Sequence, residues 1–333
     1  MRSFAQSSPD QRVPVVVAVP VDPQAISAIK NVDGRVEVLF HDPHSEPGAR
    51  QRMLADAEIM FGIPADVPGG PTEVLRSCPS LRWCHATNQA TLDGLRSATF
   101  TDEERRRIQI TGAGGGHAAA LAEFAMFGLL AWAKQLSGRP TARQGADHPL
   151  SELAGQTLLI LGLGSVGAEV ARLGKAFGMR VLAMTRTGNG HAPNVDELRP
   201  ARFLGDMLPV SHAVVLALPM TGQTAGLVGA GAISRMRSDA VLVNVGHGGV
   251  LDGRALVRGL EQGQPAAVVL DAFAAAQLPD DSVLWSMSNV LISPRSAADT
   301  DRQNARVLEL FVANLRRYLR GEEVVGRLWP AAA

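Results

Sequence analysis

Short apolar runs alternate with segments of helical periodicity through the first third of the chain. Four runs have the length and the β-branched and aromatic content of buried strands: 13–20, 35–40, 58–63 and 81–86. Three segments between them are predicted to be helices: 23–31, 47–57 and 71–77. Alternation of strand and helix is typical of a parallel sheet with helices on both faces, so an α/β domain is expected here.

The alternation starts again after a polar, turn-rich segment at 137–156, which is typical of a linker. Six further runs are predicted to be strands: 157–162, 180–185, 213–218, 240–246, 266–273 and 289–294. A long, almost entirely apolar helix is expected at 117–136, buried between domains or subunits. The last helix, at about 299–320, has no strand after it, and we expect it to pack on the first domain.

The pattern predicts an α/β fold of two doubly wound parallel-sheet domains, of the Rossmann or flavodoxin-like kind. A length of 333 residues agrees with two domains, because single hydrophobic cores stop growing at about 250–300 residues.

Composition narrows the possible partners. Lys plus Arg and Asp plus Glu both number 32, so the formal net charge is zero and no basic field is present to hold a nucleic acid. The longest apolar stretch, at 118–133, contains Glu123 and is too short to span a bilayer, and residues 1–14 lack the apolar core of a signal peptide. We expect a cytoplasmic protein that binds neither nucleic acid nor membrane.

Cys78 and Cys84 lie close together in sequence without metal-type spacing or histidine companions. We therefore expect two small buried side chains, no disulfide framework and no metal.

A glycine-rich turn carries the strongest chemical signal. Gly162, Gly164 and Gly167 stand in G-x-G-x-x-G register directly after an apolar strand and at the start of a helix, with Ser165 and Val166 between them. In this context the motif is typical of dinucleotide binding. The first glycine permits the tight turn, the second lets the backbone approach a pyrophosphate, and the third lets helix and strand pack closely. The helix N-terminus attracts the anion.

The end of the next strand indicates which nicotinamide cofactor fits. Sites that prefer NAD usually have an acidic residue there for the ribose 2′-hydroxyl, whereas this chain has Thr185 followed by Arg186. A guanidinium can pair with a 2′-phosphate through two hydrogen bonds, so NADP is expected, with NAD as the second choice. The alternative is that Arg186 is a solvated surface arginine.

Four ordered motifs resemble the D-isomer-specific 2-hydroxyacid dehydrogenases, most closely the glyoxylate/hydroxypyruvate reductase-like branch. They are "GLGSVG", "LALPMTGQTAGLVG" (216–229), "VLVNVGHGGVLDGRAL" (241–256) and "VVLDAFAAAQLPDDSVLWSMSNVLISPRS" (268–296). The resemblance implies hydride transfer between a nicotinamide and a small 2-oxo or 2-hydroxy acid. It also implies cofactor contacts from six further residues: Leu218, Pro219, Thr224, Val245, Gly246 and Asp271.

The chain departs from the family pattern at the positions that carry its chemistry. Matched position by position, His247 stands for the family's substrate-binding arginine, Ala276 for its glutamate and Arg295 for its histidine. In the substrate loop, Thr91 replaces a glycine whose bare backbone N–H would receive a carboxylate. The turn around His247 keeps Asn244 and its glycines.

Three hypotheses follow from this departure. In the first, the roles are exchanged, so that Arg295 binds the substrate anion and His247 protonates the alkoxide. In the second, the substrate is a bulkier or less anionic ketone or imine. In the third, the chain is a non-catalytic dinucleotide-binding protein, a sensor or a scaffold. We expect an oxidoreductase with His247 and Arg295 as its catalytic residues.

The expected architecture follows the family. A substrate-binding-type domain is formed by 1–110 plus 299–333, and a dinucleotide-binding Rossmann domain by 111–298 is inserted into it. We expect the active crevice between the two domains and a homodimer contact through the helix at 117–136. His117, directly before that helix, is expected to have a structural role.

Overall fold

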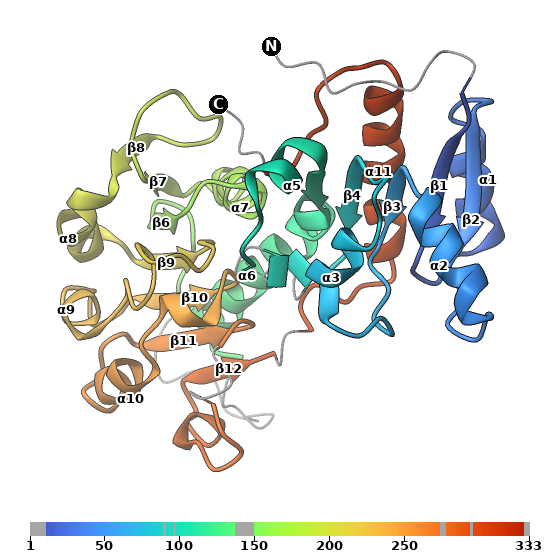
Figure 1. Ribbon diagram of the computed structural model, residues 1–333. Helices are drawn as coiled ribbons and strands as arrows, with labels where there is room; N and C mark the ends of the chain where they lie inside the picture. Colours follow the sequence, from blue (N-terminus) through green and yellow to red (C-terminus); the bar gives the residue numbers. More distant parts are fainter. Residues whose placement is uncertain are drawn as a thin grey trace. The chain divides into compact units, whose positions relative to one another are not determined.

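The computed structural model describes residues 11–88, 91–92, 94–95, 98–136, 150–273, 278–293 and 296–329. The chain divides into two compact units (Figure 1). Unit 1 consists of Met1–His117 and Asp301–Ala333, and unit 2 consists of Ala118–Thr300. These divisions lie near the domain bounds expected at 110 and 298. Each unit is described by itself, and most of the expected linker at 137–156 lies outside the described residues.

Unit 1 contains a six-stranded sheet in the order β13-β5-β4-β3-β1-β2. All strands are parallel except β13, which is antiparallel to β5. The strands are β1 (Val13–Val17), β2 (Val36–Phe40), β3 (Ile59–Phe61), β4 (Trp83–Ala86), β5 (Gln109–Gly112) and β13 (Arg327–Trp329). The sequence pattern predicts neither β5 nor β13, because each mixes polar and apolar residues and neither stands out as an apolar run.

The helices whose bounds the structure gives for unit 1 are α1 (Pro23–Lys30), α2 (Pro47–Asp56), α3 (Gly70–Arg76), α5 (Asp102–Arg107) and α11 (Gln303–Leu319). Helix α1 begins where the Asp22 carboxylate accepts a hydrogen bond from the Ala25 N–H at 2.7 Å. Helix α5, which was not predicted, begins at a capping box formed by Thr101 and Glu104.

The valines of β1 alternate between two hydrophobic cores, as a strand buried on both faces requires. Val15 and Val17 pack on one face with Ile29 of α1 and Phe311 of α11, whereas Val16 packs on the other face with residues of α2 and α3. The prediction that the last helix packs on the first domain is therefore confirmed.

Unit 2 contains a seven-stranded, fully parallel sheet in the order β12-β11-β10-β9-β6-β7-β8. The strands are β6 (Thr157–Leu161), β7 (Arg180–Thr185), β8 (Glu197–Pro200), β9 (Ala213–Leu216), β10 (Val241–Asn244), β11 (Ala267–Leu270) and β12 (Val290–Ile292). The helices are α6 (Ala118–Ala133), α7 (Ser165–Ala176), α8 (Leu204–Met207), α9 (Ala230–Ile233) and α10 (Gly253–Glu261). Together with unit 1 this confirms the predicted fold of two parallel-sheet α/β domains.

Helices cover both faces of the unit 2 sheet. Leu158 and Ile160 of β6 face α6 and α7, and Leu159 and Leu161 face α8, α9 and α10. The chain crosses from one face to the other where β6 lies beside β9, and this is the position at which open α/β sheets bind ligands.

The apolar helical segment Ala113–Ala133 combines a short 3₁₀ helix, η1 (Ala113–Gly115), with α6. By length and composition it could cross a membrane, which corrects the expectation that it is too short. More than half of its most apolar stretch is buried, and Ala122, Ala125 and Leu129 belong to the core that α6 shares with α7 and the sheet. This burial is that of a core helix.

Cys78 and Cys84 are both buried and free, as expected. They belong to the core between the unit 1 sheet and helices α2 and α3.

A buried polar group lies in the other core of unit 1. His85 is fully buried, and its Nδ1 lies 2.7 Å from Thr111 Oγ1. That oxygen accepts a hydrogen bond from Trp83 Nε1 at 2.9 Å, so its own proton is available to His85 Nδ1. The neutral ring then carries its proton on Nε2, which has no hydrogen-bond partner in the described structure. Burial lowers the pKa of His85 to about 4.

The lowered pKa of His85 predicts that the free energy of unfolding falls in acid. The folded-state pKa lies below the unfolded value of 6.5, so the unfolded chain binds the proton first. The His85 contribution is complete above pH 6.5 and is lost as the pH falls towards 4, by about 3 kcal/mol in total. Denaturant unfolding, followed by tryptophan fluorescence at several pH values between 4 and 7, measures this loss in the free energy of unfolding. The His85→Phe variant should lose less stability over this range than the wild type.

The matched control is His44→Phe, because His44 is an exposed histidine of the same unit. It should keep the wild-type dependence on pH. Equal slopes for His85→Phe and His44→Phe would contradict the assignment.

Candidate functional site

The carboxyl ends of five neighbouring strands in unit 2 lie at one edge of the sheet. Strand register pairs the last residues of β6, β9, β10, β11 and β12, so the residues that follow them are also neighbours. These residues are Gly162, Ala217, Val245, Asp271 and Ser293. Most of the residues predicted to bind the cofactor therefore lie along this one edge.

The glycine-rich turn after β6 is formed by close backbone contacts. Gly162 has φ of +98°, and a Cβ there would lie 2.8 Å from the Ala217 carbonyl oxygen. A Cβ on Gly167 would lie only 2.0 Å from the Gly162 carbonyl oxygen. A Cβ on Gly164, in contrast, would meet no protein atom within 4 Å. The protein thus requires two of the glycines for its own packing and leaves open space in front of the third.

That open space lies at the start of α7. Gly164 is the N-cap residue, Ser165 is the first helical residue, and Val166 packs partly into the core. A helix N-terminus directs backbone N–H groups and a positive dipole outward, which favours an anionic group. The residues present therefore fit the pyrophosphate of a dinucleotide.

The loops after β9 and β10 touch each other through their backbones. A Cβ on Gly246 would lie 2.8 Å from both the N and the O of Leu218. Val245 is buried in the core and donates its N–H to Leu216. Thr224 closes the β9 loop, because its hydroxyl donates to the Pro219 carbonyl at 2.6 Å. The Thr224 side chain shapes the loop on which Leu218 and Pro219 lie.

Arg186 follows the last residue of β7 and is exposed. Thr185 accepts a hydrogen bond from the Gly188 N–H at 2.9 Å, which turns the chain behind it. Thr185 pairs with Pro200 at the end of β8, so the short 3₁₀ helix η2 (Ala201–Phe203) begins at the same edge and brings a second arginine, Arg202. Sequence reasoning missed Arg202, because β8 has the sequence ELRP and shows no apolar run.

Two carboxylates, one just before β8 and one on its first residue, are held near the opposite end of these strands. Asp196 pairs with Lys175 at 2.8 Å and accepts the Val181 N–H, and these hydrogen bonds lower the pKa of its carboxyl group. Glu197 pairs with Arg180 at 2.8 Å. Arg186 therefore has neither of these anions beside it.

The turn after β10 carries His247. Its backbone N–H donates to the Leu218 carbonyl at 3.1 Å, and its Nδ1 accepts the Gly249 N–H at 3.1 Å. Asn244, fully buried at the end of β10, donates to the Ala272 carbonyl at 2.8 Å and accepts the Gly246 N–H. His247 is thus held at the same edge as the glycine-rich turn, as expected.

Four further residues were singled out from the sequence: Asp271, Ala276, Arg295 and His117. Asp271 is buried at the end of β11, and its carboxylate accepts the Ala297 N–H at 2.9 Å. Arg295 and Ala276 lie outside the described residues, so the role predicted for Arg295 stays a prediction. His117 is nearly buried at the end of unit 1.

The Thr91 N–H is already used within unit 1. It donates to the Asn88 side-chain oxygen at 2.9 Å, at the start of a helical turn that follows β4 and includes Thr91 and Leu92. This is the backbone group that the family resemblance assigns to a substrate carboxylate. Here a side-chain carbonyl of the protein takes that place, and an incoming anion would have to displace it.

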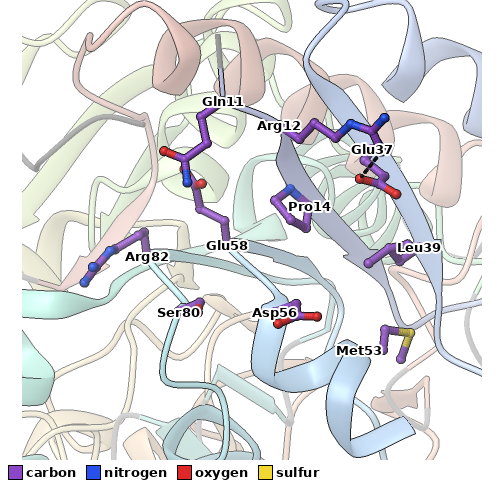
Figure 2. A pocket seen from close by; sticks show the side chains of 10 residues that line it. All are labelled: Gln11, Arg12, Pro14, Glu37, Leu39, Met53, Asp56, Glu58, Ser80 and Arg82. Carbon is purple, nitrogen blue, oxygen red and sulfur yellow. Dashed lines mark hydrogen bonds and ion pairs between the residues drawn. The ribbon is translucent and has the colours of Figure 1, made fainter. Parts of the chain in front are cut away.

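A cavity of about 730 Å³ lies elsewhere in unit 1 (Figure 2). Arg12 and Pro14 come from the start of β1, Glu37 from β2, and Glu58 and Arg82 from just before β3 and β4. The cavity therefore lies at the amino ends of the strands. Open parallel sheets bind ligands at the opposite, carboxyl end, so we do not place the active site here.

No group of three or more His, Cys, Asp or Glu side chains suited to a metal ion occurs in the described part of the chain.

Comparisons with known proteins agree with this geometry. A family model described as "D-isomer specific 2-hydroxyacid dehydrogenase, NAD binding domain" matches residues 125–297. The glyoxylate reductase of Thermococcus gammatolerans is 33% identical over 264 residues, which cover 75% of this chain and 77% of the relative. The glyoxylate reductase of Korarchaeum cryptofilum is 32% identical over 271 residues, which cover 75% and 76% of the two chains.

A solved structure shows the same fold. A D-isomer specific 2-hydroxyacid dehydrogenase family protein from Aeromonas salmonicida matches with a TM-score of 0.77 and 27% identity, over 96% of this chain and 99% of that one. The chain therefore belongs to the D-isomer specific 2-hydroxyacid dehydrogenase family of oxidoreductases, which act on CH–OH and C=O groups, and unit 2 contains its NAD-binding domain.

Proposed function

We propose that the chain is an NADP(H)-preferring reductase of a 2-oxo acid or related carbonyl, with a catalytic set that differs from the family pattern. One observation carries this proposal. The carboxyl edge of the unit 2 sheet, here called the cofactor edge, keeps the glycine-rich turn, and on the same edge His247 stands where the family has its substrate-binding arginine. Curated relatives named glyoxylate reductases support a small 2-oxo acid as substrate.

The cofactor is held by backbone at one end and by side chains at the other. The start of α7 at Gly164, Ser165 and Val166 binds the pyrophosphate, and the loops at Leu218 and Gly246 line the path from it to the end of β11. Asp271 lies at that end. A bound dihydronicotinamide supplies the hydride.

The preference for NADP(H) is assigned to Arg186, with Arg202 as its neighbour. Arg186 is exposed at the end of β7, where an adenosine ribose lies in dinucleotide-binding folds. The Arg202 guanidinium stacks on Phe203 at 4.9 Å, which holds a second positive charge at the same edge. Two cations without a nearby carboxylate from the β7–β8 connection favour a 2′-phosphate over a 2′-hydroxyl.

Three expectations from the sequence stay predictions. The homodimer is supported by the exposed face of α6, where Phe127 is 52% exposed and lies beside Phe124. The crevice between the two domains and the cytoplasmic location stay predictions from the sequence.

The first test is oxidation of NADPH and of NADH with a panel of glyoxylate, hydroxypyruvate, bulkier ketones and imines. Turnover is expected with at least one member of the panel, and with NADPH in preference to NADH. Cofactor binding is measured by fluorescence on the same sample. Tight NADPH binding without turnover on any member would favour the non-catalytic dinucleotide-binding alternative.

Removal of Arg186 tests the cofactor preference. Hydrogen bonds to charged groups contribute about 1.5–3 kcal/mol, so Arg186→Ala should weaken NADPH binding about 10- to 100-fold and leave NADH binding nearly unchanged. The dissociation constants of both cofactors measure this. The matched control is Arg180→Ala, at the other end of the same strand, which should affect neither. Equal losses for NADPH and NADH in Arg186→Ala would sink the 2′-phosphate assignment.

The glycine-rich turn predicts opposite effects of two neighbouring alanines. Gly164→Ala meets no protein atom, so it should leave stability unchanged and weaken NADPH binding at least about tenfold, because its methyl group occupies the anion's place. Gly167→Ala forces a contact of 2.0 Å and should lower the free energy of unfolding by about 1–3 kcal/mol. Denaturant unfolding and cofactor titration of both variants separate the two effects. A Gly164→Ala variant that binds NADPH normally would refute the assignment of the pyrophosphate site.

A further inference from the structure

The His247 ring is part of the turn that carries it. Its Nδ1 accepts the Gly249 N–H at 3.1 Å and caps the short 3₁₀ helix η4 (Gly248–Val250). A backbone N–H can only donate, so Nδ1 must be the nitrogen without a proton. The neutral ring therefore carries its proton on Nε2.

This contact is incompatible with an imidazolium ring. A ring protonated on both nitrogens has N–H groups on both, and its Nδ1–H would face the Gly249 N–H. The cap would be lost, and Gly249 would need a new acceptor. Losing a hydrogen bond in this way costs about 0.5–1.5 kcal/mol, and more if the donor stays buried without a partner.

The backbone of His247 is fixed on both sides. Its N–H donates to the Leu218 carbonyl at 3.1 Å, and its carbonyl accepts the Val250 N–H at 3.1 Å. Asn244 Nδ2 lies 3.5 Å from the same carbonyl, and it also donates to the Ala272 carbonyl at 2.8 Å. Asn244 thereby joins the His247 turn to the end of β11.

We infer that His247 acts as a neutral hydrogen-bond donor through Nε2 and does not give up a proton, and that Asn244 is the positioning residue for this role. The inference rests on the proposed function. It replaces the role of proton donor expected from the sequence. A neutral imidazole that donates a hydrogen bond can polarise a carbonyl group.

The reaction balances without a proton from His247. The hydride brings an electron pair to the carbonyl carbon, the π pair of the C=O bond moves to oxygen, and the cofactor is oxidised. Nε2–H stabilises the developing negative charge on that oxygen. The oxygen then takes a proton from water, and His247 keeps its own.

A neutral His247 also changes how the substrate carboxylate is bound. A guanidinium holds a carboxylate by charge and by two parallel hydrogen bonds, whereas a neutral imidazole offers one hydrogen bond and no charge. We therefore expect His247 to contribute to polarising the carbonyl more than to binding an anion. Variants at 247 should change kcat more than KM.

The first experiment reads the tautomer directly. The full chain is labelled with ¹⁵N in its histidines and loaded with NADP⁺, and the ring nitrogens are recorded by long-range ¹H–¹⁵N correlation at the pH of the turnover assay. The His247 signals are identified by their absence in His247→Gln. The expected pattern is an unprotonated Nδ1 and a protonated Nε2. A protonated Nδ1 at that pH would overturn the inference.

Asn244→Ala tests the positioning role, with Asn289→Ala as its matched control. Asn289 also donates its side-chain amide to a backbone carbonyl of a neighbouring strand, Ala266 at 3.0 Å, but at the opposite end of the sheet. In Asn244→Ala the His247 signals should move towards a mixture of both tautomers, and in Asn289→Ala they should not. Unchanged His247 signals in Asn244→Ala would remove Asn244 from this role.

Kinetics of two variants at 247 separate a hydrogen-bond donor from an acid. Glutamine can still donate from its Nε2 but cannot act as an acid, whereas phenylalanine can do neither. The kcat of His247→Gln should therefore exceed that of His247→Phe by about tenfold or more, because one hydrogen bond to a developing charge contributes about 1.5–3 kcal/mol. Equally low kcat values for the two variants would contradict the inference and favour His247 as a general acid.

The two proposals fail in different ways. The tautomer is a property of the turn and is measured without turnover, so a wrong tautomer refutes this inference even if the reductase is active. A correct tautomer with no turnover on the whole panel refutes the reductase and leaves the description of the turn intact.

Discussion

Backbone crowding at the carboxyl edge of unit 2 is the constraint on which the rest of the site depends. A Cβ on Gly167 would lie 2.0 Å from the Gly162 carbonyl oxygen, and a Cβ on Gly246 would lie 2.8 Å from the backbone of Leu218. The ends of β6, β9 and β10 can therefore meet only as bare backbone. Because they meet, the start of α7 and the His247 turn lie along one edge, and a single dinucleotide can extend past both.

The two ends of the cofactor edge are built differently. At the start of α7, binding comes from backbone and from open space at Gly164, which almost any sequence with the same glycines would provide. At the end of β7 the proposed function assigns the choice between NADP and NAD to two side chains, Arg186 and Arg202. Cofactor binding and cofactor choice are thus separable, and a change at Arg186 need not disturb the turn.

Strands that lie in continuous apolar runs were predictable from the sequence, and three strands that mix polar and apolar residues were not. The runs that became β1 and β11 are apolar over their whole length, and G-x-G-x-x-G after β6 marks its turn. The strands β5, β8 and β13 each contain charged or amide side chains and show no apolar run. The start of helix α5 could have been predicted from the sequence, since Thr101 and Glu104 have capping-box spacing.

In the candidate site, too, the sequence predicts where residues lie better than it predicts their contacts. The position of His247 on a turn at the sheet edge followed from the glycines and the strand before it. Its tautomer did not, because that depends on a 3.1 Å contact with the Gly249 N–H. The Asn88 contact with the Thr91 N–H, in contrast, has the spacing of a helix N-cap, which the sequence does contain.

Two groups that the family resemblance assigns to a substrate carboxylate are altered here, each within its own unit. In unit 1 the Thr91 N–H already has a protein acceptor, and in unit 2 a guanidinium is replaced by an imidazole whose Nδ1 is occupied by its own turn. Each change weakens attraction for an anion, and neither removes the means to polarise a carbonyl. Under the proposed function, the two changes favour a carbonyl substrate recognised less by a carboxylate than by the rest of its structure.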